Sequence, residues 1–132
     1  MGYVFPRRRD RKQVVPKASF LLLVQLEFAS VEDRIAAEEA WKPEADHCGR
    51  NEPGTLSYEL ARSDKNDRAV VIIERYADKD EAYLNVHKGS AAFKKFRPQL
   101  AALKPKIVGE SYVASDLGYM SRYEAAAPAD DE

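Results

Sequence analysis

Residues 20–28 read FLLLVQLEF, and this segment decides the fold class. Its second half alternates, because Val24, Leu26 and Phe28 share one parity while Gln25 and Glu27 lie between them. Period-two alternation of branched and aromatic residues predicts a strand with one buried face. The apolar run is far shorter than the ~20 residues that cross a bilayer. We therefore expect a strand of a soluble domain rather than a membrane span.

Charge is unevenly distributed over the 132 residues. Residues 1–17 hold six basic residues against one acidic residue, whereas residues 124–132 hold four acidic residues and no basic one. We expect a flexible basic arm (1–17), one folded domain (18–115), and a C-terminal extension with an acidic tail (116–132). The net charge of −1 argues against a nucleic-acid partner, and the single Cys48 excludes an internal disulfide. We expect a cytoplasmic protein without a membrane partner.

The segments that follow the first strand predict the remaining elements. Ser30 is expected to cap a helix that reaches Cys48 and that Pro43 kinks or splits near Lys42. Further strands are predicted at 55–61, 69–76 and 106–113, a short helix at 78–86 and a longer one at 93–103. The order β-α-β-β-α-β is that of the α+β ferredoxin-like fold, a four-stranded antiparallel sheet with helices on one face. The other face of such a sheet has no helix over it, so we predict a homodimer in which two sheets pack face to face.

Three segments resemble the antibiotic biosynthesis monooxygenase (ABM) domain: EPGTLSYE (52–59), IERYAD (73–78) and HKGSAAF (87–93). The resemblance covers about residues 18–115. It implies a dimeric α+β barrel with an apolar pocket between sheet and helices. For the members that are enzymes, it implies oxygenation of aromatic substrates without metal, flavin or haem. In the haem-degrading branch, a histidine and a tryptophan are expected where this chain has Arg97 and His87, which argues against haem chemistry.

His87 is the candidate catalytic residue. A cofactor-free oxygenase must deprotonate an electron-rich phenol or anthrone, because the resulting anion passes an electron readily to dioxygen. Histidine is the commonest base near neutral pH, and the C-terminus of a helix favours its protonated form. The resemblance places this position at the border of the pocket. The alternative is a structural role, in which the ring bonds backbone near residues 87–90.

Other side chains are candidates for binding the substrate. Tyrosine offers a flat apolar face and a hydroxyl, so we select Tyr58, Tyr76 and Tyr83, while Trp41 is a candidate for closing the pocket. Glu74 and Arg75 lie on opposite faces of a strand, and Glu74 is a candidate for holding a substrate hydroxyl. Core packing is the alternative for each aromatic residue, and an ion pair is the alternative for the acid.

The sequence gives no support to metal or thiol chemistry, because His47-Cys48 has no further ligands at metal-binding spacing and no neighbouring base. We therefore predict a site with no metal and no cofactor. The leading hypothesis is a cofactor-independent monooxygenase that oxidises a small aromatic or quinol-type substrate with dioxygen. The alternatives are a stress-related barrel that only binds a small apolar molecule, and an isomerase-like member of the same family.

Overall fold

The computed structural model describes residues 18–123, and every described helix and strand lies within Ala18–Ala114. The elements are β1 (Phe20–Glu27), α1 (Val31–Asn51), β2 (Thr55–Arg62), β3 (Ala69–Tyr76), the π-helix η2 (Lys79–His87), α2 (Ala91–Ala102) and β4 (Lys106–Val113). Residues 115–123 form no helix or strand. The basic arm predicted at 1–17 and the acidic residues 124–132 lie outside the described residues. No described helix is both long and apolar enough to cross a membrane.

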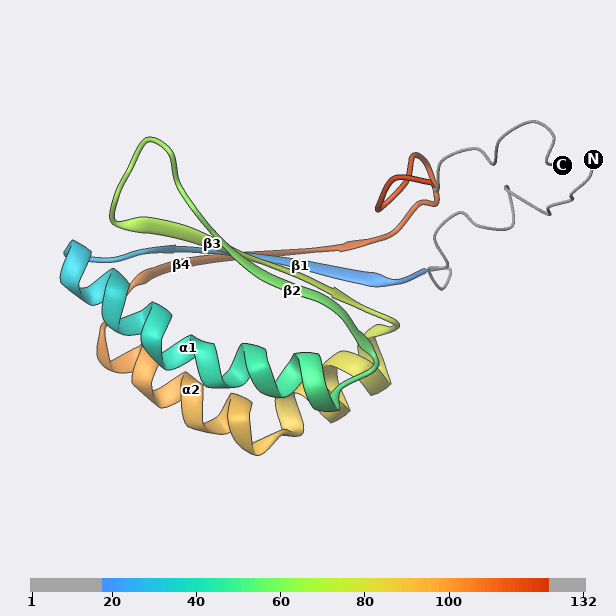
Figure 1. Ribbon diagram of the computed structural model, residues 1–132, viewed down its shortest axis with the longest axis horizontal. Helices are drawn as coiled ribbons and strands as arrows, with labels where there is room; N and C mark the ends of the chain where they lie inside the picture. The colour runs from blue at the N-terminus through green and yellow to red at the C-terminus, as the bar shows by residue number, and fades with distance from the viewer. Residues whose placement is uncertain (1–17, 124–132) are drawn as a thin grey trace, which may run out of the picture. The chain divides into compact units, whose positions relative to one another are not determined.

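The four strands form one antiparallel sheet in the order β2-β3-β1-β4. This order and both α-helices on one face confirm the predicted ferredoxin-like α+β fold (Figure 1). Strand β3 alternates strictly, so that Val70, Ile72, Glu74 and Tyr76 are buried and the residues between them are only half-buried. The buried parity faces the helices, which places Glu74 and Tyr76 in the layer between sheet and helices.

Helix α1 begins at the predicted cap, where Asp33 N donates to Ser30 Oγ at 3.1 Å. Of the two outcomes predicted at Pro43, the split is wrong, because the helix runs without interruption to Asn51, and the kink stays a prediction. Proline removes one backbone hydrogen bond, but tertiary packing outweighs this local cost. Ala37 and Cys48, one on each side of Pro43, are both buried, so the helix keeps one inward-facing stripe along its length.

The segment before α2 is a π-helix rather than the short α-helix predicted from Asp78 to Val86. Its start agrees with the prediction, since the Asp78 carboxylate accepts hydrogen bonds from Ala82 N at 2.9 Å and Glu81 N at 3.4 Å. It ends at His87, one residue later than expected. Helices of the π type are rare and occur frequently at functional sites. Helix α2 follows, with Ser90 Oγ accepting from Phe93 N at 3.1 Å.

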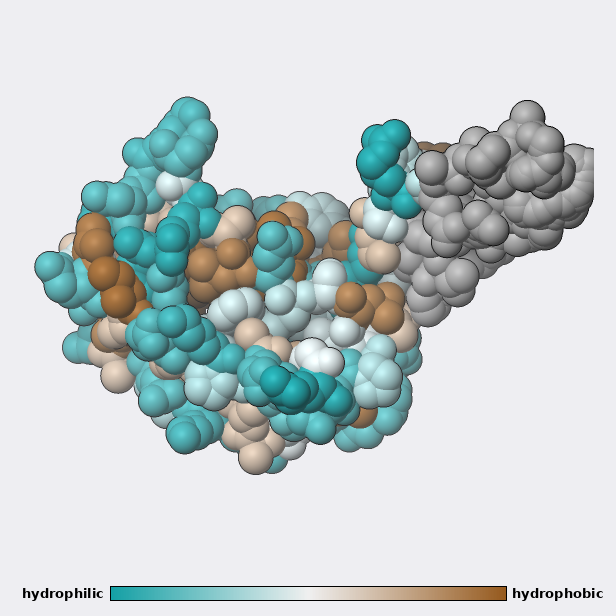
Figure 2. Space-filling view, viewed as in Figure 1, coloured by the Kyte–Doolittle hydropathy of each residue, from teal (hydrophilic) through white to brown (hydrophobic). Residues whose placement is uncertain are grey.

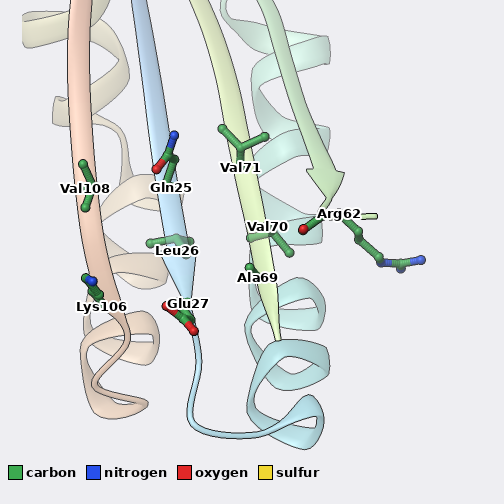
Figure 3. Close-up of a pocket in the computed structure, with 10 residues that line it drawn as sticks. Gln25, Leu26, Glu27, Arg62, Ala69, Val70, Val71, Lys106 and Val108 are labelled. Atoms are coloured by element: carbon green, nitrogen blue, oxygen red, sulfur yellow. The ribbon is translucent and has the colours of Figure 1, made fainter. Parts of the chain in front are cut away.

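The face of the sheet away from the helices has no described element over it (Figure 1). All eight residues of β4 are exposed. Figure 2 shows apolar residues along the band of strands, while the helical surface below it is mostly hydrophilic. A hollow of about 370 Å³ on the sheet is lined by Gln25, Val71 and Val108, which lie on neighbouring strands (Figure 3). The predicted homodimer would cover this face, and it stays a prediction.

Candidate functional site

A cavity of about 360 Å³ lies between the sheet and α2. Its walls are mostly apolar, from Leu22 and Ile72 on the strands to Phe93 and Leu100 on α2. The polar groups in its lining are the side chains of Tyr58, Glu74, Tyr83, Lys88 and Arg97. Small-molecule sites have this volume and this composition, with few polar groups among apolar ones.

Glu74 is the acidic group of the cavity. It lies on β3 opposite Tyr58 of β2, and its Oε1 accepts a short hydrogen bond from the hydroxyl of Tyr76. Burial raises the pKa of Glu74 to about 7, against the lowering effects of Tyr76 and Arg97, and with a further increase from Glu44. Glu74 therefore takes up and releases a proton near neutral pH.

His87 is not part of the cavity lining and lies behind its aromatic wall. The side chain is 1% exposed. Ring centroids surround its imidazole at 5.1 Å for Tyr58, 5.2 Å for Tyr76, 5.3 Å for Phe93 and 6.2 Å for Tyr83. Any substrate in the cavity is therefore separated from His87 by these rings, and a direct contact needs them to move.

Two carboxyl groups lie at the two nitrogens of His87. Glu52 Oε1 is 3.0 Å from Nδ1, and Glu44 Oε2 is 3.3 Å from Nε2. Burial lowers the pKa of His87 and outweighs the opposite effect of Glu52, so the ring is neutral at pH 7 and not protonated as the helix end alone would favour. Burial would raise the pKa of Glu52, but hydrogen bonds from His87 and Thr55 leave it lowered. Glu52 is thus ionised, Nδ1 donates to it, and Nε2 is left as an acceptor.

Glu44 is the partner on the acceptor side. Burial raises its pKa to about 7, the Tyr58 hydroxyl lowers it, and the charge of Glu52 raises it further. Neither carboxyl oxygen of Glu44 has a hydrogen bond of ordinary geometry among the described residues. A Glu44 carboxyl that holds a proton can donate it to Nε2 of His87, which lies 3.3 Å from Oε2.

Trp41 and Tyr76, both selected from the sequence, also lie outside the cavity lining. The Trp41 ring contacts the Tyr58 ring at a centroid distance of 5.1 Å and packs on the core cluster of Leu26, Phe28 and Phe96. Tyr76 is fully buried and holds Glu74 through its hydroxyl. Trp41 therefore supports the wall from behind, and of the selected residues only Tyr58, Tyr83 and Glu74 line the cavity.

Among residues 18–123, one cluster of donor atoms is close enough together for a metal ion. Cys48, Glu52 and His87 each offer an atom within 4.8 Å of the others. Hydrogen bonds already account for these atoms, because Glu52 Oε1 accepts from Thr55 Oγ1 at 2.8 Å as well as from His87. The Cys48 sulfur also lies 3.5 Å from Nδ1 of His87, within hydrogen-bond distance for sulfur. We assign hydrogen bonds rather than a metal to this trio.

Comparison with known families agrees with this geometry. The model of the family described as antibiotic biosynthesis monooxygenase matches residues 21–99, more than half of the chain. The chain belongs to the ABM family. A comparison with curated protein sequences finds no match.

Solved structures share the ABM fold at low sequence identity. SnoaB of Streptomyces nogalater, a cofactor-independent oxygenase, matches with a TM-score of 0.61 at 16% identity, covering 75% of this chain and 95% of its own. Rv0793 of Mycobacterium tuberculosis gives 0.63 at 21% identity, covering 75% and 97%. A Caulobacter crescentus protein named for the same family gives 0.67 at 24% identity, covering 76% and 92%. These likenesses show the fold alone.

Four residues of this ABM site were not selected from the sequence. Lys88 and Arg97 line the cavity, and Glu44 and Glu52 lie at the two nitrogens of His87. A signal for Glu44 exists, because Ala37, Trp41, Glu44 and Cys48 follow spacings of four, three and four along α1. An acid within the buried stripe of a helix indicates a polar site in the core. Arg97 has the same signal, because it lies four residues after Phe93 and three before Leu100 on the apolar face of α2.

Proposed function

We propose that this ABM protein is a cofactor-independent monooxygenase that oxidises a small phenolic or quinol-type aromatic molecule with dioxygen. The carrying observation is the cavity of about 360 Å³, whose apolar and aromatic wall holds one carboxyl group with a pKa of about 7, Glu74. Lys88 and Arg97 add two cations to the same lining. A flat substrate that becomes an anion during the reaction suits this combination of base, cations and rings.

The chemistry follows from the charge of the substrate. Glu74 accepts the acidic proton, and Arg97 stabilises the anion that remains. This electron-rich anion transfers an electron to dioxygen, and the pair combines to a peroxide that loses water. In total, the ring CH₂ group of an anthrone and O₂ give a C=O group and H₂O. A quinol with a free ring C–H position and O₂ give a hydroxyquinone and H₂O, so neither reaction needs a reductant. A base with a pKa near the working pH is the most effective one for the first step.

His87 contributes to this proposal as a proton acceptor behind the wall. His87 does not line the cavity, so we assign the contacts with the substrate to Glu74, Tyr58 and Tyr83, which do line the cavity. The neutral imidazole can then receive a proton through Glu44 at Nε2. Tyr76 holds Glu74 in place, and Trp41 supports Tyr58.

Oxygen uptake with 1,8-dihydroxyanthrone and a naphthoquinol tests the proposal. We expect wild type to consume one O₂ per substrate oxidised, and Glu74→Gln to lose about 10²-fold or more of the rate. Glu59→Gln is the matched control, because Glu59 lies on the neighbouring strand with the opposite parity, is exposed, and should keep full activity.

The alternatives predict other results in the same assay. A barrel that only sequesters its ligand quenches the fluorescence of Trp41 without oxygen uptake. An isomerase returns a product of unchanged mass, also without oxygen uptake. Either outcome with these compounds refutes the oxygenase proposal.

We also propose that the protein is a homodimer joined through the uncovered sheet face. The support is the exposure of all of β4 together with the apolar Val71 and Val108 on that face. Soluble monomers rarely expose large continuous apolar areas. Sedimentation at micromolar concentration tests this, and a folded monomer refutes it.

A further inference from the structure

A line of carboxyl and imidazole groups runs from the cavity wall to the surface of the protein. Three of its members come from α1 and the residue that caps it, since Glu44, His47 and Glu52 lie at intervals that keep them on adjoining faces of the helix. His87 joins them from the end of η2. Acid and base alternate along the line, in the order Glu44, His87, Glu52, His47.

The distances between successive members are short. Glu44 Oε2 lies 3.3 Å from His87 Nε2, His87 Nδ1 lies 3.0 Å from Glu52 Oε1, and Glu52 Oε2 lies 3.1 Å from His47 Nε2. Each distance is within the reach of a hydrogen bond or slightly beyond it. The two inner members, His87 and Glu52, use a different atom for each of their two neighbours, as a chain of proton transfers requires.

The two ends of the line open to different environments. The His47 side chain is 33% exposed, whereas Glu44, Glu52 and His87 are at most 2% exposed. At the inner end, Tyr58 lines the cavity and its hydroxyl is close enough to lower the pKa of Glu44. The line therefore connects the cavity with water at the C-terminal end of α1.

The contacts between successive members of the line are close, but several of them lack a hydrogen bond of good geometry. Glu44 Oε1, Glu44 Oε2, Glu52 Oε2 and His87 Nε2 are buried without a hydrogen bond of good angle among the described residues. Buried polar atoms are costly to leave without partners, so a purely structural network would be expected to align them. A small rotation of an imidazole ring aligns one joint at a time, which is how a histidine passes a proton from one side to the other.

We propose that Glu44, His87, Glu52 and His47 form a proton relay that connects the cavity, through Tyr58, with the solvent. An outward step begins when Glu44 gives a proton to Nε2 of His87. His87 then releases its Nδ1 proton to Oε1 of Glu52. The Glu52 carboxyl group rotates so that this proton faces Nε2 of His47, His47 accepts it there, and His47 releases a proton to water. One proton enters and one leaves, and rotation or tautomerisation of the His87 ring restores the starting state.

The protonation states at pH 7 suit this direction. Glu52 is ionised and His87 is neutral, so that the relay begins with an empty Nε2. Glu44, with a pKa of about 7, supplies or removes a proton at little cost. In relation to the proposed function, on which this role rests, the relay removes the proton that the substrate loses in the cavity.

The relay can be tested without a substrate, through the ring N–H proton of His87. We would measure its exchange with water by nitrogen-edited NMR, using saturation transfer and line width. The variant His47→Ala removes the outer member at a half-exposed position, which leaves the buried core intact. We expect exchange to become at least about tenfold slower in His47→Ala, and added imidazole buffer to restore it in proportion to its concentration.

Glu38→Gln is the matched control. Glu38 is an acid of the same helix at the edge of burial, ion-paired with Arg34 and Arg62 and outside the relay. If exchange required only local opening of α1, this variant would accelerate it. If the relay works, Glu38→Gln does not slow the exchange of the His87 ring N–H proton with water. Added imidazole then leaves the exchange rate of this variant unchanged.

The outcomes separate this proposal from the proposed function. Equal exchange in wild type and His47→Ala, or slow exchange that imidazole does not restore, overturns the relay whatever the oxygen assay gives. If the exchange results hold and no compound supports oxygen uptake, the oxygenase proposal fails and the relay remains. If both hold, Glu44→Gln should lower the turnover rate and leave exchange at Nδ1 of His87 within about twofold of wild type.

Discussion

Gly54 lies in the turn between α1 and β2, and its replacement by alanine gives a direct test of how tightly η2 is held. A Cβ atom at Gly54 would lie 2.8 Å from the Cβ of Ala82 and 3.6 Å from its Cα. Ala82 belongs to η2 and is buried against Phe20 and Tyr76. The Gly54 carbonyl accepts a hydrogen bond from Ala77 N at 2.8 Å, which fixes the turn against the end of β3. Neither side of the contact can withdraw freely.

The size of the effect follows from this contact. Two carbon atoms attract each other best at about 3.5 to 4.0 Å, so roughly 1 Å must open between the turn and η2. Overpacking of this kind costs typically 1–3 kcal/mol, and we expect Gly54→Ala to lower the free energy of unfolding by about 2 kcal/mol. The φ angle of Gly54 is not in the left-handed region, so the cost comes from the contact and not from the backbone.

A second variant isolates the contact. Ala82→Gly removes the opposing methyl group and alone should cost about 1 to 2 kcal/mol, from the helix interior and the lost burial. The double variant has alanine at position 54 and glycine at position 82. The Cβ at position 54 then no longer meets a Cβ at position 82, so the clash disappears. We expect the double variant to be at least about 1 kcal/mol more stable than the sum of the single effects predicts.

Urea unfolding followed by the fluorescence of Trp41 measures all four proteins, because this single tryptophan packs on Tyr58 in the core. Simple additivity of the two substitutions would contradict the reasoning. So would a cost below about 0.5 kcal/mol for Gly54→Ala, since the turn and η2 would then be loose. A loose η2 would also leave His87 without a fixed position.

Three further predictions concern charge and assembly. The folded-state pKa of Glu74 is raised to about 7, so the protonated acid stabilises the folded state at pH 5, and this contribution falls as pH rises to about 7. In urea unfolding, the free energy of unfolding of Glu74→Gln should therefore rise relative to wild type by up to about 3 kcal/mol between pH 5 and pH 8. A difference that does not change with pH contradicts the raised pKa. Glu38→Gln should lower the free energy of unfolding by about 1 to 2 kcal/mol in the same assay, because Glu38 accepts hydrogen bonds from Arg34 at 2.7 Å and from Arg62 at 2.9 and 3.0 Å. An unchanged free energy of unfolding means that solvent screens the exposed Arg62 completely. Val108→Asp places a charge on the uncovered sheet face and should shift sedimentation from dimer to monomer while circular dichroism stays unchanged; a variant that remains dimeric places the interface elsewhere.

The strands could be predicted from the sequence because their residue patterns are local. Alternation with period two predicted β1, a run of four branched residues predicted β3, and the observed ends lie within one residue of the expected ones. Pro43 shows the limit of local rules, since burial along the whole of α1 outweighs the hydrogen bond that the proline removes. The π-helix also escaped prediction, because its wider hydrogen bonding has no distinct residue pattern.

The site could be predicted only in its residue types. Tyr58, Tyr83 and Glu74 line the cavity, and their role in binding a substrate stays a prediction. His87 was expected at the border of the pocket, and the structure places it behind the rings. Sequence spacing predicts which face of an element a side chain lies on. Whether that side chain reaches the cavity depends on the size of its neighbours, and here the tyrosine rings lie between His87 and the cavity.

The two carboxyl groups with a pKa of about 7 lie on different sides of the aromatic wall, Glu74 in the cavity and Glu44 behind it. The charge of an ionised Glu44 raises the pKa of Glu74, which makes Glu74 a stronger base. A relay that removes the proton of Glu44 to solvent therefore increases the basicity of the cavity before each turnover, without any contact with the substrate. The position of Glu44 behind the aromatic wall thus agrees with a role in proton transfer, because the group that raises the pKa of Glu74 stays shielded from the substrate in the cavity.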